Sequence, residues 1–446
     1  MPLLPRKIIG IFGVLGLTAA LFLLFFESIS TALFFLCGVI LTLIYLEKPA
    51  WGFFLLIFIR QITDRYSDLT VFSLKNLFFI NLSGALGLIL IGFSAFFLIQ
   101  NRSKVSKIPL AKPIALFMLL SLISFSYSVD LTLSLAEFLR VSGFFMLYLA
   151  TYDLFNTNQE KKENLLKLIV IASVIPFMVG IFQIITKTGL GGTTGITSRI
   201  YSTYSHPNAF AIFALIIFAI AMYYQFVYQN KAPITKLPLI VYTGLTFALL
   251  ILTYGRGGIL ALMCFSLILS FYRGNKIFIF LIGFVFAILF FVSPTVHNRI
   301  EDVYNPPANS SVRWRFEQWK RSWEIFLEKK VLGYGTGTEK IAFGHEYGYN
   351  LVYQAHNDYL LMLVELGIIG LILYLFLLSK ILKKLYLAYQ QAQNQNEKDL
   401  AFVILALSIS LFFYAIVNNI HNSTAIHWIY WPLLALVLKK SKAQQE

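Results

Sequence analysis

Charged residues are scarce in this chain: Asp, Glu, Lys and Arg make up 13% of its 446 positions, whereas 58% are hydrophobic and 16% aromatic. Such a composition excludes a protein folded around one soluble core. Long apolar runs take the place of polar surface, and many of them approach the length of about 20 residues that a membrane-spanning helix needs. We therefore expect an all-α polytopic membrane protein with a single transmembrane domain over residues 1–446.

Cysteine is almost absent, because the chain has only Cys37 and Cys264, and both lie inside apolar runs. A thiol in such a run behaves as a small hydrophobic group, so neither a disulfide nor a cysteine metal site is expected. The sequence also lacks a His-x-x-x-His pattern and an Asp/Glu pair of metal-binding type in its expected outer loops. We expect no metal and no cofactor.

The hydropathy pattern predicts about fourteen spans, with about twelve as a lower estimate because some runs are short. The runs cover residues 8–26, 29–46, 49–60, 77–99, 113–127, 135–152, 165–186, 207–228, 238–253, 259–272, 277–292, 356–379, 400–417 and 426–438. A second run follows the first at once, which favours an uncleaved first helix over a signal peptide.

The net charge of +15 is explained by topology. Basic residues of short loops remain on the cytoplasmic side of a membrane. One alternating arrangement of fourteen spans puts nearly all basic clusters on one face, which leaves both chain ends inside and the loops 187–206, 253–258 and 293–355 outside. Because the Lys and Arg residues are dispersed and form no continuous stripe, nucleic-acid binding is not expected.

The loop 293–355 is the one large extracytoplasmic insertion. Its segment 310–329 spaces Trp and Phe at helical intervals and predicts an amphipathic helix that lies at the level of the lipid headgroups. A glycine-rich turn follows at 333–338. Two interpretations of this turn are open: close approach of the backbone to a substrate, or a helix cap and connector.

Three charged residues stand at span boundaries on the predicted outer face. Arg199 precedes a His-Pro-Asn sequence, Arg256 lies in a Tyr-Gly-Arg-Gly-Gly turn, and His356 follows the long loop. An arginine at such a boundary is commonly a membrane anchor. The glycines beside Arg256 favour function, because they leave room around a guanidinium whose donors match phosphate oxygens. A histidine is suited to accept a proton near neutral pH.

Other polar residues within the predicted spans and loops have simpler interpretations. His206 stands before Pro207, where a turn or cap is expected. Glu137 and Arg140 are three positions apart and predict an intramembrane ion pair. Glu365 lies in an apolar run with no obvious partner.

These motifs together resemble the O-antigen ligase family. The resemblance is carried by Arg199 with the His-Pro-Asn sequence, the Tyr-Gly-Arg-Gly-Gly turn, an Arg/Trp-rich segment ending in Gly-Tyr-Gly-Thr-Gly, and Ala-His-Asn-Asp-Tyr-Leu followed by Glu-Leu-Gly-Ile-Ile-Gly. It covers about residues 195–375 and elsewhere consists of hydropathy only. The same signature also includes O-antigen and exopolysaccharide polymerases and some protein O-oligosaccharyltransferases.

The resemblance implies a GT-C-like membrane glycosyltransferase that transfers a glycan en bloc from undecaprenyl diphosphate, with inversion and without a metal ion. It implies that His356 is the base and that Arg199 and Arg256 bind the diphosphate. Arg313 and Arg315 both resemble an arginine of the family that precedes a Trp-containing helix. Weaker candidates for substrate contact are Tyr204, Asn208 and Asn357.

The acceptor is not determined by the sequence. A ligase would use lipid A core, a polymerase another lipid-linked glycan, and an oligosaccharyltransferase a protein; we favour the ligase. A transporter or flippase is the alternative from another class, but the polar groups gather at one face and no inverted repeat is seen. The expected location is the bacterial cytoplasmic membrane, with the site facing the periplasm or the cell exterior.

Overall fold

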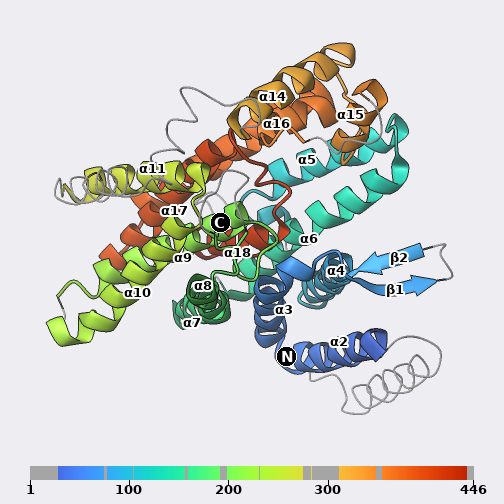
Figure 1. The fold of residues 1–446 in the computed structure, drawn as a ribbon. Helices are drawn as coiled ribbons and strands as arrows, with labels where there is room; N and C mark the ends of the chain where they lie inside the picture. Colours follow the sequence, from blue (N-terminus) through green and yellow to red (C-terminus); the bar gives the residue numbers. More distant parts are fainter. Residues whose placement is uncertain are drawn as a thin grey trace.

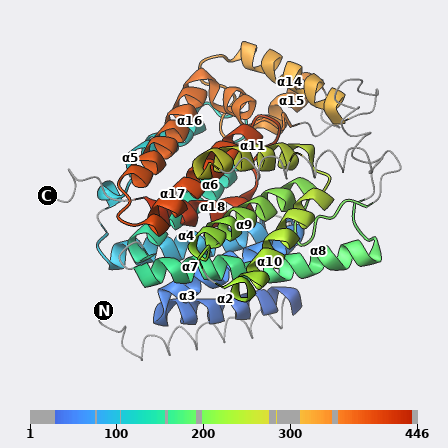
Figure 2. The ribbon, with the colours of Figure 1, turned by 90° about the vertical axis from the view of Figure 1, so that its left-hand side faces the viewer.

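The chain folds into a bundle of helices (Figures 1 and 2). The computed structural model describes residues 29–74, 78–103, 105–155, 159–190, 198–230, 232–274, 283, 311–347 and 354–438. The predicted runs at 8–26 and 277–292, and most of the first part of the long loop, lie outside the described residues. Elsewhere each predicted run falls on at least one helix.

The helices of the first half are α2 (Ile29–Glu47), α3 (Pro49–Thr63), α4 (Leu82–Gln100), α5 (Ala111–Ile123), α6 (Leu131–Phe155), α7 (Gln159–Ala172), α8 (Val174–Thr186) and α9 (Pro207–Val227). Those of the second half are α10 (Pro233–Leu252), α11 (Arg256–Arg273), α14 (Ser311–Glu328), α15 (Glu339–Tyr347), α16 (Asp358–Gln390), α17 (Gln395–Tyr414) and α18 (Thr424–Val437).

The strands of the described part are β1 (Thr70–Leu74) and β2 (Phe78–Asn81), which pair antiparallel as a hairpin beside α4 (Figure 1). The predicted run 77–99 therefore begins as a strand. The strand ends at Asn81, because the side chain of this residue accepts the N–H of Gly84 at 2.8 Å and caps the start of α4.

Within the described residues, five helical segments are long and apolar enough to cross a bilayer: Leu82–Gln100, Leu131–Phe155, Glu160–Thr186, Pro207–Val227 and Asp358–Gln390. Shorter apolar helices accompany them in the described residues. The chain is thus an all-α polytopic membrane protein, as the composition predicts.

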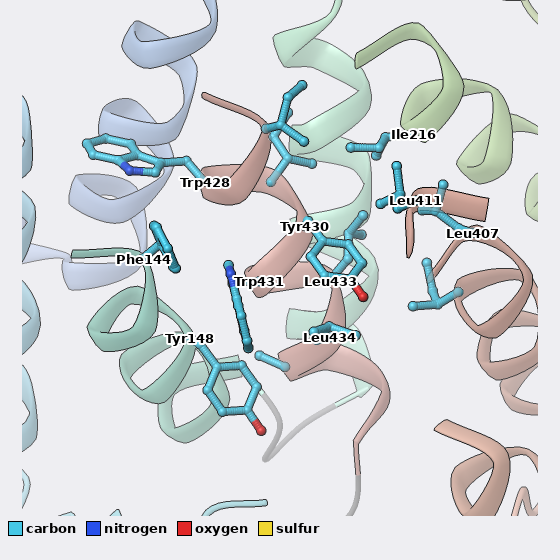
Figure 3. Packing of buried hydrophobic residues seen from close by; sticks show 14 of the residues in the cluster. Phe144, Tyr148, Ile216, Leu407, Leu411, Trp428, Tyr430, Trp431, Leu433 and Leu434 are labelled. Atoms are coloured by element: carbon cyan, nitrogen blue, oxygen red, sulfur yellow. The ribbon is translucent and has the colours of Figure 1, made fainter. Parts of the chain in front are cut away.

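Helices α9 and α18 form the centre of the bundle. Helix α9 is buried along most of its length and packs against α10, α11 and α17, and α18 packs against α6. Aromatic rings fill the space between α6 and α18, where Trp431 lies parallel to Phe144, with ring centroids 6.1 Å apart, and edge-on to Tyr148 (Figure 3). Close packing of this kind replaces the hydrophobic drive that lipid cannot supply between helices.

Helix α16 is not one continuous span over the predicted run 356–379. Gly367 has φ 63° and ψ −162°, a backbone conformation that is almost exclusive to glycine. The hydroxyl of Tyr374 lies 3.3 Å from Asp358 Oδ2, although sixteen residues of straight helix would separate the two by about 24 Å. Residues 358–366 therefore form a short arm that folds back on the longer arm 368–390.

The insertion packs on this hinge. Tyr334 N–H donates to Val364 O at 3.0 Å, and Ile368 N–H to Lys330 O at 2.9 Å. The predicted amphipathic helix is confirmed as α14, whose Ile325 is buried with Phe343 and Val364. The interpretation of 333–338 as a cap and connector fits this packing, because the glycines of the turn face neighbouring protein atoms.

Candidate functional site

Arg199 is held by two segments that come together at one end of the bundle. Its Nε donates to Thr253 O at 2.9 Å, and its Nη2 donates to Asn208 Oδ1 at 3.2 Å. Thr253 is the residue after α10, and Asn208 lies in the first turn of α9. The sequence-predicted arginine is thus fixed beside Asn208, one of the weaker candidates.

A chain of two amides connects Arg199 with Arg315 of α14. Asn208 Nδ2 donates to Asn418 Oδ1 at 3.0 Å, and the same oxygen lies 3.4 Å from Arg315 Nη2. Asn418 belongs to the loop after α17 and was not predicted from the sequence. Arginine side chains 116 positions apart in sequence (315 minus 199) therefore converge on one pair of amides.

The structure distinguishes between Arg313 and Arg315, which the sequence left equivalent. Arg313 lies 3.5 Å from Glu317 with more than half of each side chain exposed. Arg315 is directed to Asn418, and its charge acts on His356. Arg315 is therefore the arginine of this helix that belongs to the candidate site.

His356 lies between α14 and the start of α16, where its ring centroid is 5.3 Å from that of Trp314. Burial, and secondarily the charge of Arg315, lower the pKa of His356 to about 4. Its imidazole is thus neutral at pH 7 and able to accept a proton. Its φ of 48° is unusual for a residue with a side chain.

Hydrogen bonds hold the backbone on both sides of His356. Ala355 N–H donates to Glu339 Oε1 at 2.8 Å, and Ala355 O accepts from Trp319 Nε1 at 2.9 Å. On the other side, Asn357 Oδ1 accepts the N–H groups of Tyr359 and Leu360. Asn357, predicted as a weak candidate for substrate contact, thus caps α16.

Arg256 begins α11, whose first turn packs against the same amides. A Cβ at Gly255 would lie 3.2 Å from Asn208 Oδ1, and one at Gly257 would lie 2.7 Å from Asn418 Nδ2. The expectation that these glycines leave room around the Arg256 guanidinium stays a prediction, although a Cβ on either glycine would meet side chains of α9 or of the 414–418 segment. The backbone on both sides of Arg256 thus lies against the Asn208–Asn418 pair.

Tyr204 does not line an open site, contrary to its place among the candidates. It is fully buried against Phe210 and Phe213, and its hydroxyl donates to Gln61 Oε1 at 2.6 Å. His206 has the predicted cap role, because its Nδ1 accepts the N–H of Asn208 at 3.1 Å.

The polar end of α3 fixes the loop that carries Arg199, and the sequence did not reveal this. Gln61 O accepts from Thr203 Oγ1 at 2.7 Å, and Asp64 Oδ2 accepts from both the N–H and the hydroxyl of Ser205. Asp64 also pairs with buried Arg60 at 2.8 Å. The only signal in the sequence was a group of polar residues at the end of a short apolar run.

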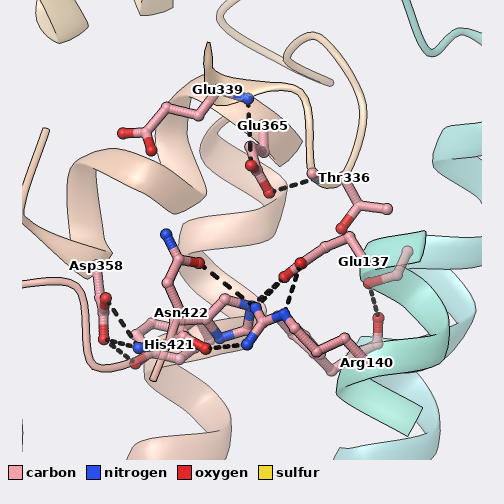
Figure 4. Close-up of polar contacts among 12 residues, drawn as sticks. Glu137, Arg140, Thr336, Glu339, Asp358, Glu365, His421 and Asn422 are labelled. Atoms are coloured by element: carbon pink, nitrogen blue, oxygen red, sulfur yellow. Dashed lines mark hydrogen bonds and ion pairs between the residues drawn. The ribbon is translucent and has the colours of Figure 1, made fainter. Parts of the chain in front are cut away.

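A buried polar cluster lies beside the hinge of α16 (Figure 4). The predicted pair of Glu137 and Arg140 is confirmed, and His421 Nε2 lies 3.1 Å from Glu137 Oε1. Asp358 accepts the N–H of His421. Glu365, which lacked an obvious partner, accepts the N–H groups of Gly337 at 2.8 Å and Glu339 at 3.3 Å.

Among the described residues, no group of three or more His, Cys, Asp and Glu side chains is placed to hold a metal ion. The groups available for chemistry are therefore the neutral imidazole of His356 and the guanidinium groups of Arg199, Arg256 and Arg315. Guanidinium groups suit an anionic ligand such as a phosphate.

Part of the chain is similar to known proteins. Residues 241–375 match the family described as O-Antigen ligase. The chain is 32% identical over 123 residues to a "Putative polysaccharide ligase" of Rickettsia conorii, and 34% identical over 121 residues to a protein of the same description in Rickettsia felis. These matches cover 26% and 25% of this chain and 28% of each relative.

The matched family segment contains Arg256, Arg315, Glu339 and His356, whereas Arg199, Asn208 and Asn418 lie outside it. The structure nevertheless connects Arg315 of this segment with Arg199 through the amides of Asn208 and Asn418. In this segment the chain is similar to the O-antigen ligase family, and the other residues lie outside the match.

Proposed function

We propose that this protein transfers a glycan en bloc from undecaprenyl diphosphate to an acceptor hydroxyl, with lipid A core as the acceptor. His356 removes the proton of that hydroxyl, and the oxygen attacks the anomeric carbon of the donor glycan. The attack comes from the face opposite the diphosphate, so the configuration is inverted as the bond from this carbon to the diphosphate oxygen breaks and undecaprenyl diphosphate leaves with the electron pair.

The arginines stabilise the leaving group. Arg199, Arg256 and Arg315 bind the diphosphate, whose negative charge grows as the bond breaks. Preorganised cations stabilise such a charge more in the transition state than in the ground state, and no metal ion is needed for that effect. The lipid-linked donor supplies the chemical energy, so neither ATP nor another cofactor is required.

The single observation that carries this proposal is the hydrogen-bonded series Arg199–Asn208–Asn418–Arg315 beside a histidine that is neutral at pH 7. A base and two fixed cations side by side suit a reaction that takes a proton at one point and releases an anion at another. Glu365 and the other buried carboxylates stabilise the segments that carry these residues and take no part in the reaction.

The positions of the basic residues support a location in the bacterial cytoplasmic membrane with the site on the periplasmic or external side. Donor and acceptor then both reach the site from the outer leaflet. Membrane lipids surround the bundle, and nucleic acid has no part in the reaction.

The test is transfer by purified protein in detergent, with EDTA present and with an undecaprenyl-diphosphate-linked oligosaccharide as donor. Lipid A core and a second lipid-linked repeat are offered as rival acceptors. We expect product on lipid A core, and its loss in His356→Ala and Arg256→Ala. A ladder of longer lipid-linked chains would instead identify a polymerase, and full activity in His356→Ala would refute the proposed base.

A further inference from the structure

His356 has a backbone conformation that its own side chain does not favour. Its φ of 48° lies in the left-handed region, which glycine and Asn or Asp occupy far more readily than other residues. Such a conformation persists where the surroundings impose it, and it is found most often at functional sites. The question is which groups impose it here.

The angle φ of His356 is measured from the peptide plane that joins Ala355 to His356. The carbonyl of that plane is Ala355 O, which accepts a hydrogen bond from Trp319 Nε1 at 2.9 Å. The preceding plane is held by the Ala355 N–H, which donates to Glu339 Oε1 at 2.8 Å. Ala355 is fully buried, so water does not replace these partners. Both planes before His356 are therefore fixed by side chains from elsewhere.

Both side chains come from rigid supports. Glu339 is 3% exposed, and its own N–H donates to the carboxylate of Glu365 on the short arm of α16 (Figure 4). Trp319 lies on α14, four residues after Arg315. The helix that carries Arg315 to Asn418 thus also sets the peptide plane of His356.

We propose that Glu339 and Trp319 are positioning residues that hold His356 in its left-handed conformation, with its imidazole beside Trp314. The expected effect on glycan transfer rests on the proposed function, whereas the conformation of His356 does not. Neither residue exchanges a proton with the acceptor. They set the direction in which the imidazole faces the reacting hydroxyl.

Matched substitutions test the two hydrogen bonds. Glu339→Gln keeps an oxygen for the Ala355 N–H, whereas Glu339→Ala removes it. Trp319→Phe keeps the packing but removes the indole N–H. We expect kcat to fall about tenfold in Glu339→Ala and severalfold in Trp319→Phe, with the KM for donor unchanged, because misorientation of a catalytic group affects the chemical step. Glu339→Gln should stay within about twofold of the wild type.

A second measurement does not depend on transfer. The rate of diethylpyrocarbonate modification at His356, followed by mass spectrometry against pH, reports the imidazole directly. Its midpoint should lie near the lowered pKa of about 4 in the wild type and in Glu339→Gln. It should rise toward the ordinary value of about 6.5 in Glu339→Ala and Trp319→Phe, where the ring is released to water.

The controls are Glu317→Gln and Trp323→Phe, the same residue types on the exposed part of α14. Both should behave as the wild type. An unchanged kcat and midpoint in Glu339→Ala would overturn the proposal, and so would equal losses in Glu339→Gln and Glu339→Ala. A shifted midpoint in a protein without transferase activity would leave this inference standing and refute the proposed function.

Discussion

The two sides of the candidate site are supported in different ways. Arg199 is held by the helix bundle itself, through α3, α9 and the end of α10. His356 is held by the insertion, through α14, α15 and the hinge of α16. The side of the site that holds Arg199, the cation side, is therefore supported by the packed helices of the bundle. The side that holds His356, the base side, depends on the insertion that packs on the bundle. A substitution can therefore disturb the supports of one side without touching the residues of the other side.

The base side should fail most severely when the hinge is blocked. A Cβ at Gly367 would lie 2.2 Å from Val331 O, and its φ and ψ are those of glycine only. We expect Gly367→Ala to cost at least about 3 kcal/mol of unfolding free energy, because backbone strain and a backbone clash add. Thermal unfolding in detergent measures this loss.

Gly87→Ala is the matched control, because no atom lies within 4 Å of a Cβ at this position in α4. There the change should be neutral or slightly stabilising, by up to about 1 kcal/mol, since Ala favours helix. A Gly367→Ala protein as stable as the wild type would mean that the fold-back of α16 is not fixed by this residue.

The cation side should respond to the buried pair below its loop. Asp64→Ala leaves Arg60 buried at 2% exposure without its partner and removes the acceptor of Ser205. We expect a loss of about 3 to 5 kcal/mol in unfolding free energy, as for other broken buried ion pairs. Transfer should fall with it, since the loop of Arg199 loosens.

The double variant Arg60→Met/Asp64→Leu separates charge from packing. Replacement of both partners by apolar residues should recover most of the stability, because no unpaired charge remains. The Ser205 contacts stay absent, so activity should recover less than stability does. Equal recovery of both would show that Asp64 has no separate effect on the loop.

These sides also differ in how far the sequence predicted them. Hydropathy placed α9 and α18, and the three-residue spacing of Glu137 and Arg140 predicted their pair. The hinge at Gly367 was missed because the run 356–379 is largely apolar, and the backbone of Val331 that lies against Gly367 is distant in sequence. Local spacing cannot report such a contact.

The candidate residues also divide into those that the sequence indicates and those that only the structure brings together. His356, Arg199 and Arg256 could be named as candidates because chemistry and motif mark them in the sequence. Glu339 and Asn418 were not, because an acid in a polar loop and an amide near a helix end have no distinctive pattern. Their role arises only when segments far apart in the chain meet. One indication of these contacts was present in the sequence, because Glu365 lies in an apolar run and a carboxylate there needs a partner; in the structure it accepts the N–H of Glu339.

The bridge between the two sides should give the smallest effect on stability. Asn418→Ala removes the oxygen that accepts from Asn208 and lies 3.4 Å from Arg315. We expect a loss of about 1 to 2 kcal/mol in unfolding free energy, since one good hydrogen bond and one long contact disappear. The rate of transfer should fall about tenfold, because the two arginines no longer share a fixed separation. Asn422→Ala, in the same loop, removes only an exposed 3.4 Å contact with Arg140 Nη2 and should leave both quantities near those of the wild type. If Asn418→Ala retained the full rate, the amides would be packing residues, and the bundle and the insertion would each place its own arginine independently.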